Sequence, residues 1–127
     1  VHSCTDITGF GLMGHAYEMA SGSGVTIHLD AADVPYHEEA IAMAEQGFIP
    51  AGAYRNRDYT EGHVRIEGNV SAPVLDILYD PQTSGGLMIA VSEKDAIALE
   101  RELKGSLPCG QIIGHVTAKE DADLVID

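Results

Sequence analysis

The residues best suited to chemistry near the start of the chain are a carboxylate and two hydroxyls followed by glycines: Thr5, Asp6, Thr8, Gly9, Gly11 and Gly14. A glycine-rich turn that leads into a helix presents N–H groups at the positive end of the helix dipole, which suits phosphate. A carboxylate is a hard oxygen ligand that Mg²⁺ accepts beside phosphate oxygens. The segment therefore predicts a phosphate-proximal turn at Thr8, Gly9 and Gly11, with Asp6 as a candidate metal ligand.

A second candidate segment covers residues 80–86, with the sequence Asp-Pro-Gln-Thr-Ser-Gly-Gly. Pro81 holds the residue before it in an extended conformation, and the paired glycines let a backbone approach a ligand without an intervening Cβ. Two interpretations stay open. The segment is either a tight turn in which Asp80 caps backbone groups, or a loop that brings phosphate close to Asp80, Thr83, Ser84, Gly85 and Gly86.

The basic residues of the chain are few and partly clustered. Three of the seven, Arg55, Arg57 and Arg65, lie close together in a chain with 20 acidic residues and a net charge of −13. They form either a solvated loop or a local anion-facing edge. The overall negative charge argues against a nucleic-acid partner, because like charges repel.

The cysteines and histidines give weaker signals. Cys4 and Cys109 are far apart without a C-x-x-C motif, so we expect small packed residues and a reducing compartment. His2, Cys4 and Asp6 share strand parity, but no second ligand pair with zinc spacing accompanies them. We expect His15, just after the helix start, to cap or pack rather than to catalyse.

The elements that position these residues alternate between strands and helices. The spacing and the glycines predict three helices, over about residues 12–20, from just after Pro35 to Gly47, and over residues 74–78. A fourth helix is predicted after a capping box formed by Ser92 and Asp95, with Ala96, Leu99 and Leu103 on its inward face. Strands are predicted over residues 25–29, 87–91, 111–116 and 124–126, and the end of another strand is predicted within residues 4–8. The strand at 87–91 is expected to be buried on both faces. Residues 48–72 predict a long, weakly patterned loop with a short strand around 64–66.

This alternation predicts an α+β fold, an α/β sandwich in which helices pack on a mixed sheet. The 127 residues, 45% of them hydrophobic, support one domain with one core. No apolar run reaches the ~20 residues that cross a bilayer, so no membrane partner is expected. Because the densest motif follows Val1 almost at once, we expect a domain of a longer protein whose N-terminal partner is absent.

The two glycine segments together resemble the signature segments of the selenophosphate synthetase (selenide, water dikinase) family. The resemblance runs over residues 5–15 and 80–87, and residues 112–116 are similar to the closing I-G-x-V strand of the family. The first segment looks like the start of the C-terminal domain that this family shares with aminoimidazole ribonucleotide synthetase. The resemblance thus implies one domain over residues 1–127, with the ATP-binding N-terminal domain as its partner.

This resemblance also implies a reaction and a division of labour. Selenide and ATP give selenophosphate, AMP and orthophosphate, with Mg²⁺, in the cytoplasm and in a homodimeric full-length enzyme. Asp6 is implied to reach the magnesium–phosphate cluster from this domain. The reactive Cys or selenocysteine and a Lys are implied in the N-terminal domain, so we expect no catalytic residue in this chain and no activity from it alone.

One more segment is similar to the family, with a departure. Residues 50–56 match a family segment that is richer in glycine, and Ala51 and Ala53 stand where that pattern differs. Asn56 either orients a turn or faces the domain cleft, where the resemblance implies that it lies close to the ATP phosphates. Two alternatives to the dikinase stay open: a non-catalytic anion-binding or regulatory domain on the same fold, and a domain acting on purine or thiamine phosphate intermediates.

Overall fold

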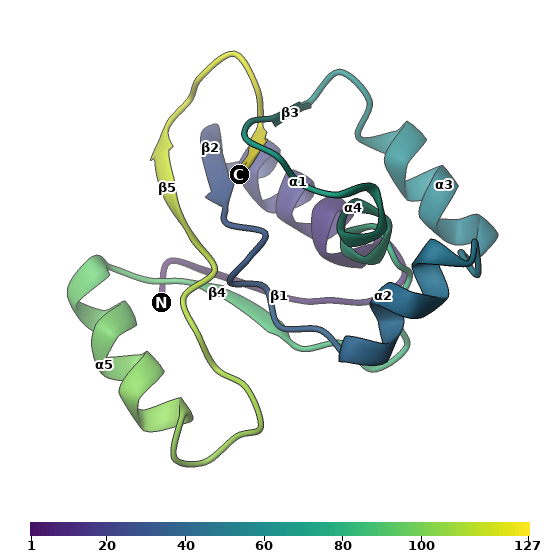
Figure 1. Ribbon diagram of the computed structural model, residues 1–127. Coiled ribbons are helices and arrows are strands. Elements are labelled where there is room, and N and C mark those ends of the chain that lie inside the picture. Colours follow the sequence, from purple (N-terminus) through teal and green to yellow (C-terminus); the bar gives the residue numbers. More distant parts are fainter.

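The computed structural model describes residues 1–127 and combines five helices with a four-stranded sheet and a separate strand pair (Figure 1). In chain order the elements are β1 (Ser3–Asp6), α1 (Gly11–Ser23), β2 (Val25–Leu29), α2 (Glu38–Glu45), α3 (Ala51–Tyr59), β3 (Val64–Ile66), α4 (Ala72–Leu78), β4 (Leu87–Ala90), α5 (Glu93–Leu103), β5 (Gly114–Ala118) and β6 (Leu124–Ile126). The predicted α+β class is confirmed. None of the helices has the length and apolar character needed to span a membrane.

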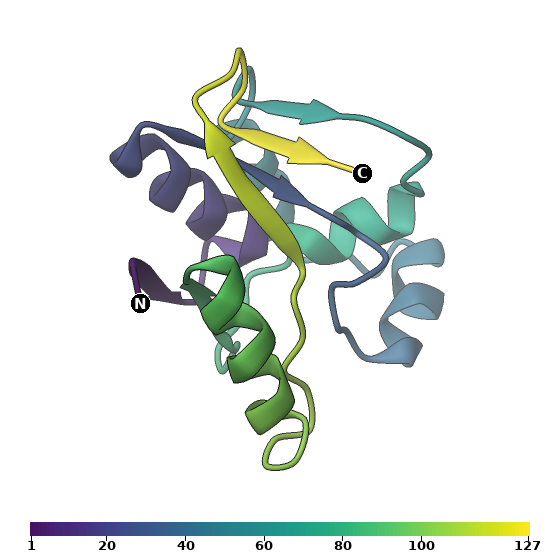
Figure 2. The same ribbon diagram turned by 90° about the vertical axis from the view of Figure 1, so that its left-hand side faces the viewer.

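The four-stranded sheet is mixed, as predicted, with the order β3-β6-β2-β5. Strand β2 runs antiparallel to β5 and parallel to β6, and β6 runs parallel to β3. Figure 2 shows these strands side by side, with α1 behind them. The pair β1–β4 is antiparallel and forms its own small sheet.

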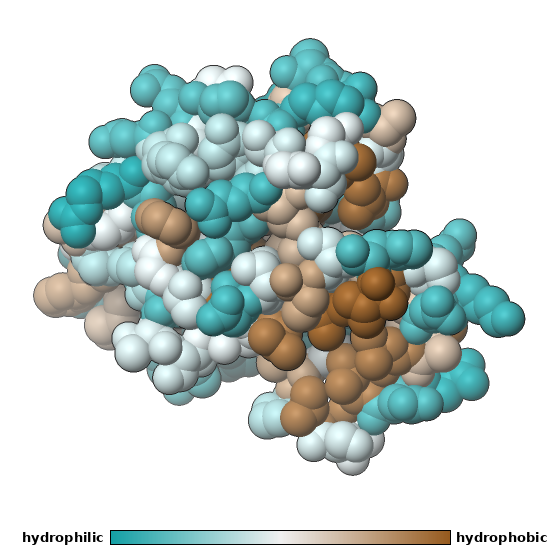
Figure 3. Space-filling view, turned by 180° about the vertical axis from the view of Figure 1, so that it is seen from behind, coloured by the Kyte–Doolittle hydropathy of each residue, from teal (hydrophilic) through white to brown (hydrophobic).

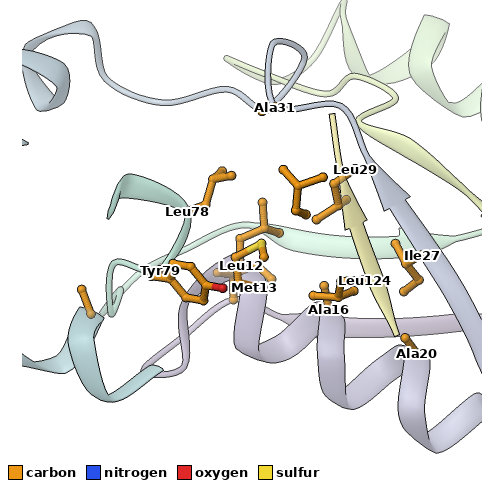
Figure 4. Packing of buried hydrophobic residues seen from close by; sticks show 13 residues of the cluster. Leu12, Met13, Ala16, Ala20, Ile27, Leu29, Ala31, Leu78, Tyr79 and Leu124 are labelled. Atoms are coloured by element: carbon orange, nitrogen blue, oxygen red, sulfur yellow. The ribbon is translucent and has the colours of Figure 1, made fainter. Parts of the chain in front are cut away.

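The core lies between α1 and one face of the four-stranded sheet (Figure 4). Met13 and Ala16 of α1 are fully buried and point toward Ile27 of β2 and Leu124 of β6. Each large aliphatic side chain buried in this way contributes about 1.5–3 kcal/mol to stability. Leu78 and Tyr79 close the same core from the end of α4.

The predicted loop over residues 48–72 is wrong, because it contains α3 as well as the short strand β3 that was expected. The side of α3 that faces the molecule carries Ala53, Asn56 and Thr60, which are 3%, 5% and 1% exposed. These positions follow helical spacing. Small and polar residues give no hydrophobic periodicity, which is why the pattern missed this helix.

The expectation that β4 is buried on both faces is also wrong. Its single neighbour is β1, and Leu87 is 67% exposed. The capping box before α5 is confirmed, since the Asp95 N–H donates to Ser92 Oγ at 3.3 Å. Its inward residues are only half-buried, however, and α5 has no fully buried residue.

Other differences concern boundaries and cysteines. The second helix begins at Glu38 rather than directly after Pro35, and the strand expected at 111–116 is β5, shifted to Gly114–Ala118. Cys4 and Cys109 are free and exposed, not packed. Cys4 lies on the exposed face of the β1–β4 pair, opposite Ile89.

The corner between β1 and α1 is held by a glycine. Gly11 has φ +68° and packs against the backbone of Tyr79 and Asp80, where a Cβ would come within 2.8 Å of the Tyr79 carbonyl carbon. A side chain there would meet both strain and overlap. Gly24, at φ +65°, ends α1 in the left-handed conformation, so the helix extends beyond residue 20 to Ser23.

We expect Gly11→Ala to destabilise the chain by roughly 1–3 kcal/mol or more, because a residue with a Cβ is strained at this φ and has no space. Gly22→Ala is the matched control: Gly22 lies inside α1 and a Cβ there meets nothing within 4 Å. Urea unfolding should show Gly22→Ala as neutral or stabilising. Equal effects of the two substitutions would contradict the proposed constraint at the corner.

The outer face of the sheet carries a charge network around Glu120. Its carboxylate accepts hydrogen bonds from His28 Nε2 at 2.8 Å, Arg65 at 2.9 Å and Thr117 Oγ1 at 2.9 Å. These bonds, led by that of His28, lower the pKa of Glu120 from 4.5 to about 2. The network thus joins side chains from strands β2, β3 and β5 through the Glu120 carboxylate.

A carboxyl with a lower pKa in the folded state adds stability above its unfolded pKa and loses it on acidification. We therefore expect Glu120→Gln to flatten the pH dependence of the unfolding free energy between pH 4.5 and about 2. Glu61→Gln is the control, because it removes one negative charge at an exposed position outside the Glu120 network. Denaturant titrations at a series of pH values test this, and identical profiles for both variants would refute it.

Candidate functional site

The two sequence segments singled out for chemistry form one structure. Strands β1 and β4 pair so that Asp6 lies opposite Leu87. Beyond the strands, the Ile7 N–H donates to the Gly86 carbonyl at 2.9 Å, and the Gln82 N–H donates to the Thr8 carbonyl at 3.0 Å. We call this pairing of residues 5–11 with residues 79–87 the motif junction. Every candidate phosphate-proximal residue lies in it, except Asn56, which contacts it from α3.

Close packing at the junction requires glycine at a second position. A Cβ on Gly85 would overlap the Ile7 carbonyl oxygen. Thr83, Ser84 and Gly86 are exposed beside it. Within the 80–86 segment, Gly85 and the backbone groups of Gln82 and Gly86 thus hold the junction together, whereas the side chains of Thr83 and Ser84 are exposed.

The Asp6 carboxylate is exposed and has no hydrogen-bond or ion-pair partner in the chain. The period of the strand puts Asp6 and Cys4 on the exposed face of the β1–β4 pair, together with Leu87 and Ile89. No group of three or more His, Cys, Asp or Glu residues is placed to hold a metal ion. A metal at Asp6 would thus need further ligands from elsewhere.

Asp80 lies in a different environment from Asp6. It is half-buried below the α1 corner and its carboxylate makes no hydrogen bond, so burial raises its pKa. Its backbone carbonyl lies against Gly11. The position supports the junction through its backbone, and a phosphate contact at Asp80 stays a prediction.

Asn56 joins three segments from inside the fold. It is 5% exposed, and its Nδ2 donates to the Gly9 carbonyl and the Tyr79 carbonyl, both at 3.0 Å. Both amide protons are used in this way. Of the two interpretations of Asn56, its contacts favour the orientation of a turn, here the α1 corner against the end of α4.

The first turn of α1 does not form an open phosphate cradle. Gly11, Leu12 and Met13 are all buried, so their N–H groups do not face solvent. His15 packs as expected: it is 8% exposed and its Nε2 lies 3.0 Å from Thr8 Oγ1. The glycines of the first motif therefore shape a corner, and Gly9 at the surface is the part of it that a ligand can reach.

The three clustered arginines have different surroundings. Arg57 pairs with Asp76 at 2.7 Å and lies over the Tyr79 ring. Arg65 pairs with Glu67, Glu120 and Asp121. Arg55 has no ion pair and borders an open hollow of about 650 Å³.

This hollow, which we call the α3 hollow, lies between the start of α3 and the motif junction. It is lined by Gly9, Phe10, Pro50, Ala51, Gly52, Arg55, Asn56, Tyr59 and Pro81. Sequence reasoning missed it because residues 48–72 were interpreted as a loop. The available signal was the small and polar stripe at 53, 56 and 60, which needs a helix to bring it to one side.

Comparison with known proteins gives a match over the whole chain. Residues 1–127 match the family model described as AIR synthase related protein, C-terminal domain. The chain is 48% identical to "Selenide, water dikinase 2" of Peptoclostridium acidaminophilum, over 99% of this chain and 36% of that protein. It is 50% identical to "Selenide, water dikinase" of Caldanaerobacter subterraneus, over 99% of this chain and 37% of that protein.

A third relative, "Selenide, water dikinase" of Treponema denticola, is 48% identical over 95% of this chain and 35% of its own length. The chain thus spans little more than a third of the length of these curated relatives. The resemblance in the two glycine segments extends over the rest of the chain. The chain belongs to the AIR synthase related protein, C-terminal domain family.

Proposed function

We propose that this chain is the C-terminal domain of a selenide, water dikinase and forms one wall of an ATP site. The identities of 48–50% with proteins of that name, over nearly the whole chain, support the proposal. They favour selenide over purine or thiamine phosphate intermediates as the substrate class. In the proposed reaction, selenide accepts one phosphoryl group of ATP and water accepts another, which gives selenophosphate, orthophosphate and AMP.

The outward, unpaired Asp6 carries the proposal for the site. Mg²⁺ is held by one or two carboxylates together with phosphate oxygens and water. Asp6 offers one such carboxylate, and its register on β1 leaves it free to do so. Bound there, Mg²⁺ would neutralise negative charge on the ATP phosphates. The remaining ligands and the reactive Cys or selenocysteine and Lys would come from the N-terminal domain.

The face that carries Asp6 also supports a partner domain. Hydrophobic side chains gather where β4, α5 and the segment leading to β5 lie (Figure 3). Leu87 of β4, Ile97 of α5 and Leu107 of the segment leading to β5 are 67%, 50% and 53% exposed. Large contiguous apolar patches mark interaction sites. We propose that the N-terminal domain of the same protein covers this face, since the relatives have nearly two thirds of their length outside the matched part.

This arrangement makes Asp6 part of an interdomain site. The N-terminal domain that covers Leu87 would also enclose the neighbouring carboxylate, excluding water from the metal and phosphates. We further propose that the full-length enzyme is a homodimer in the cytoplasm. The chain alone would be inactive, because it would supply one metal ligand, while the reactive Cys or selenocysteine and the Lys would come from the N-terminal domain.

We expect Asp6→Asn in the full-length protein to reduce selenide-dependent AMP formation by about 100-fold or more, since a metal ligand is worth several kcal/mol of transition-state stabilisation. The free energy of unfolding of the chain should be unchanged, because Asp6 makes no contact that the substitution removes. Asp33→Asn, at another exposed carboxylate, is the control. Full activity in Asp6→Asn would refute the ligand role.

The covered face predicts that Leu87→Ser affects the full-length protein and not the isolated chain. Loss of a buried leucine should cost the full-length protein roughly 1.5–3 kcal/mol, whereas the chain alone should change by less than about 0.5 kcal/mol. Phe48→Ser is the matched control, because Phe48 is 68% exposed but lies in the turn after α2, away from this face. Denaturant unfolding measures both. Equal effects of Leu87→Ser on the two proteins would contradict coverage by a partner domain.

A further inference from the structure

The α3 hollow differs in charge from the rest of the molecule. The chain has 20 acidic residues, but none of the nine residues that line the hollow is acidic. Its one charged residue is Arg55. The volume of about 650 Å³ lies in the range of small-molecule sites. A negatively charged ligand, which the acidic surface elsewhere repels, would meet a locally positive charge here.

Arg55 is free to bind such a ligand. Its neighbours on the same segment, Arg57 and Arg65, are held by carboxylates of this chain. Arg55 is exposed and makes no ion pair. A guanidinium group binds phosphate through two parallel hydrogen bonds, a geometry that a lysine does not provide.

The start of α3 adds donors to the same hollow. Pro50 precedes the helix and gives no side-chain cap, so the N–H groups of Ala51 and Gly52 have no partner within the chain. Such N–H groups attract anions. A Cβ on Gly52 would come within 2.8 Å of Pro81 Cγ, so glycine lets the helix start lie directly against the motif junction.

Asn56 leaves one acceptor at the hollow. Its Nδ2 is fixed by the Gly9 and Tyr79 carbonyls, whereas its Oδ1 accepts no hydrogen bond in the chain. The side chain is 5% exposed and lines the hollow. A fixed, unpartnered carbonyl oxygen of this kind suits a hydroxyl or amino donor on a ligand.

Two aromatic residues also line the hollow. The rings of Phe10 and Tyr59 are stacked with centroids 5.5 Å apart and planes at 22°. Both line the hollow and are 45% and 48% exposed. An exposed aromatic pair offers a flat apolar surface on which a heterocyclic ring can stack.

From these features we propose that the α3 hollow binds a nucleoside monophosphate. The phosphate pairs with Arg55 and the free N–H groups of Ala51 and Gly52. The base packs on the Phe10–Tyr59 pair, and a ligand hydroxyl donates to Asn56 Oδ1. This goes beyond the proposed function, because the site is built by this chain alone and uses neither Asp6 nor a metal.

The test is a titration of the ¹⁵N-labelled chain with AMP, followed by NMR with EDTA present. We expect AMP to shift amide resonances of Gly9, Phe10, Ala51 and Gly52, and Arg55→Gln to weaken AMP binding at least tenfold. Arg101→Gln is the matched control, because Arg101 lies on α5, is exposed and has no ion pair. It should leave AMP binding unchanged.

Adenosine and inorganic phosphate distinguish the parts of the ligand. Adenosine should bind more weakly than AMP and be insensitive to Arg55→Gln, while phosphate should bind more weakly than AMP and be insensitive to Phe10→Leu. No shifts with AMP, equal effects of Arg55→Gln and Arg101→Gln, or phosphate binding as tightly as AMP would overturn the proposal. Because the assay needs neither selenide nor turnover, its outcome is independent of the Asp6 experiment.

Discussion

The contact on which the rest of the structure depends is the motif junction, where the β1–α1 corner meets the backbone after α4. Gly11 and Gly85 allow two backbones to approach at distances that no side chain permits. Asn56 of α3 then donates hydrogen bonds to the part-buried Gly9 carbonyl in the corner and to the buried Tyr79 carbonyl after α4. Leaving a buried carbonyl unpaired costs about 1–3 kcal/mol, so the hydrogen bonds of Asn56 stabilise the close approach.

The junction also explains why two glycine-rich segments, separated by much of the chain, act as one site. The backbone of each segment is hydrogen-bonded to the backbone of the other. The side chains of Asp6, Thr83 and Ser84 are left exposed. On one side the outward surface is apolar and carries Asp6. On the other side it is the α3 hollow with Arg55. The same packed backbone therefore positions two chemically different surfaces.

The sequence allowed the mixed sheet, α1 and the capped start of α5 to be predicted, because each has a local signal: a period, a glycine stop or a capping serine. It also gave the candidate Asp6, whose type and place before the glycines indicate a ligand. It did not reveal α3, since Ala53, Asn56 and Thr60 are buried by tertiary contacts and not by hydrophobicity. The burial of β4 on both faces was wrongly predicted, because a continuous apolar run does not show whether other elements of the chain cover the strand.

A single carboxylate at an interdomain face has a physical consequence for a chain with a net charge of −13. Long-range repulsion disfavours ATP at this domain, and screening at physiological salt limits that repulsion to about 8 Å. A carboxylate adds negative charge beside a triphosphate, so under the proposal for Asp6 the metal would be held only once further ligands arrive. Binding of nucleotide, metal and partner domain would then be coupled, and the domain alone would bind ATP and Mg²⁺ weakly.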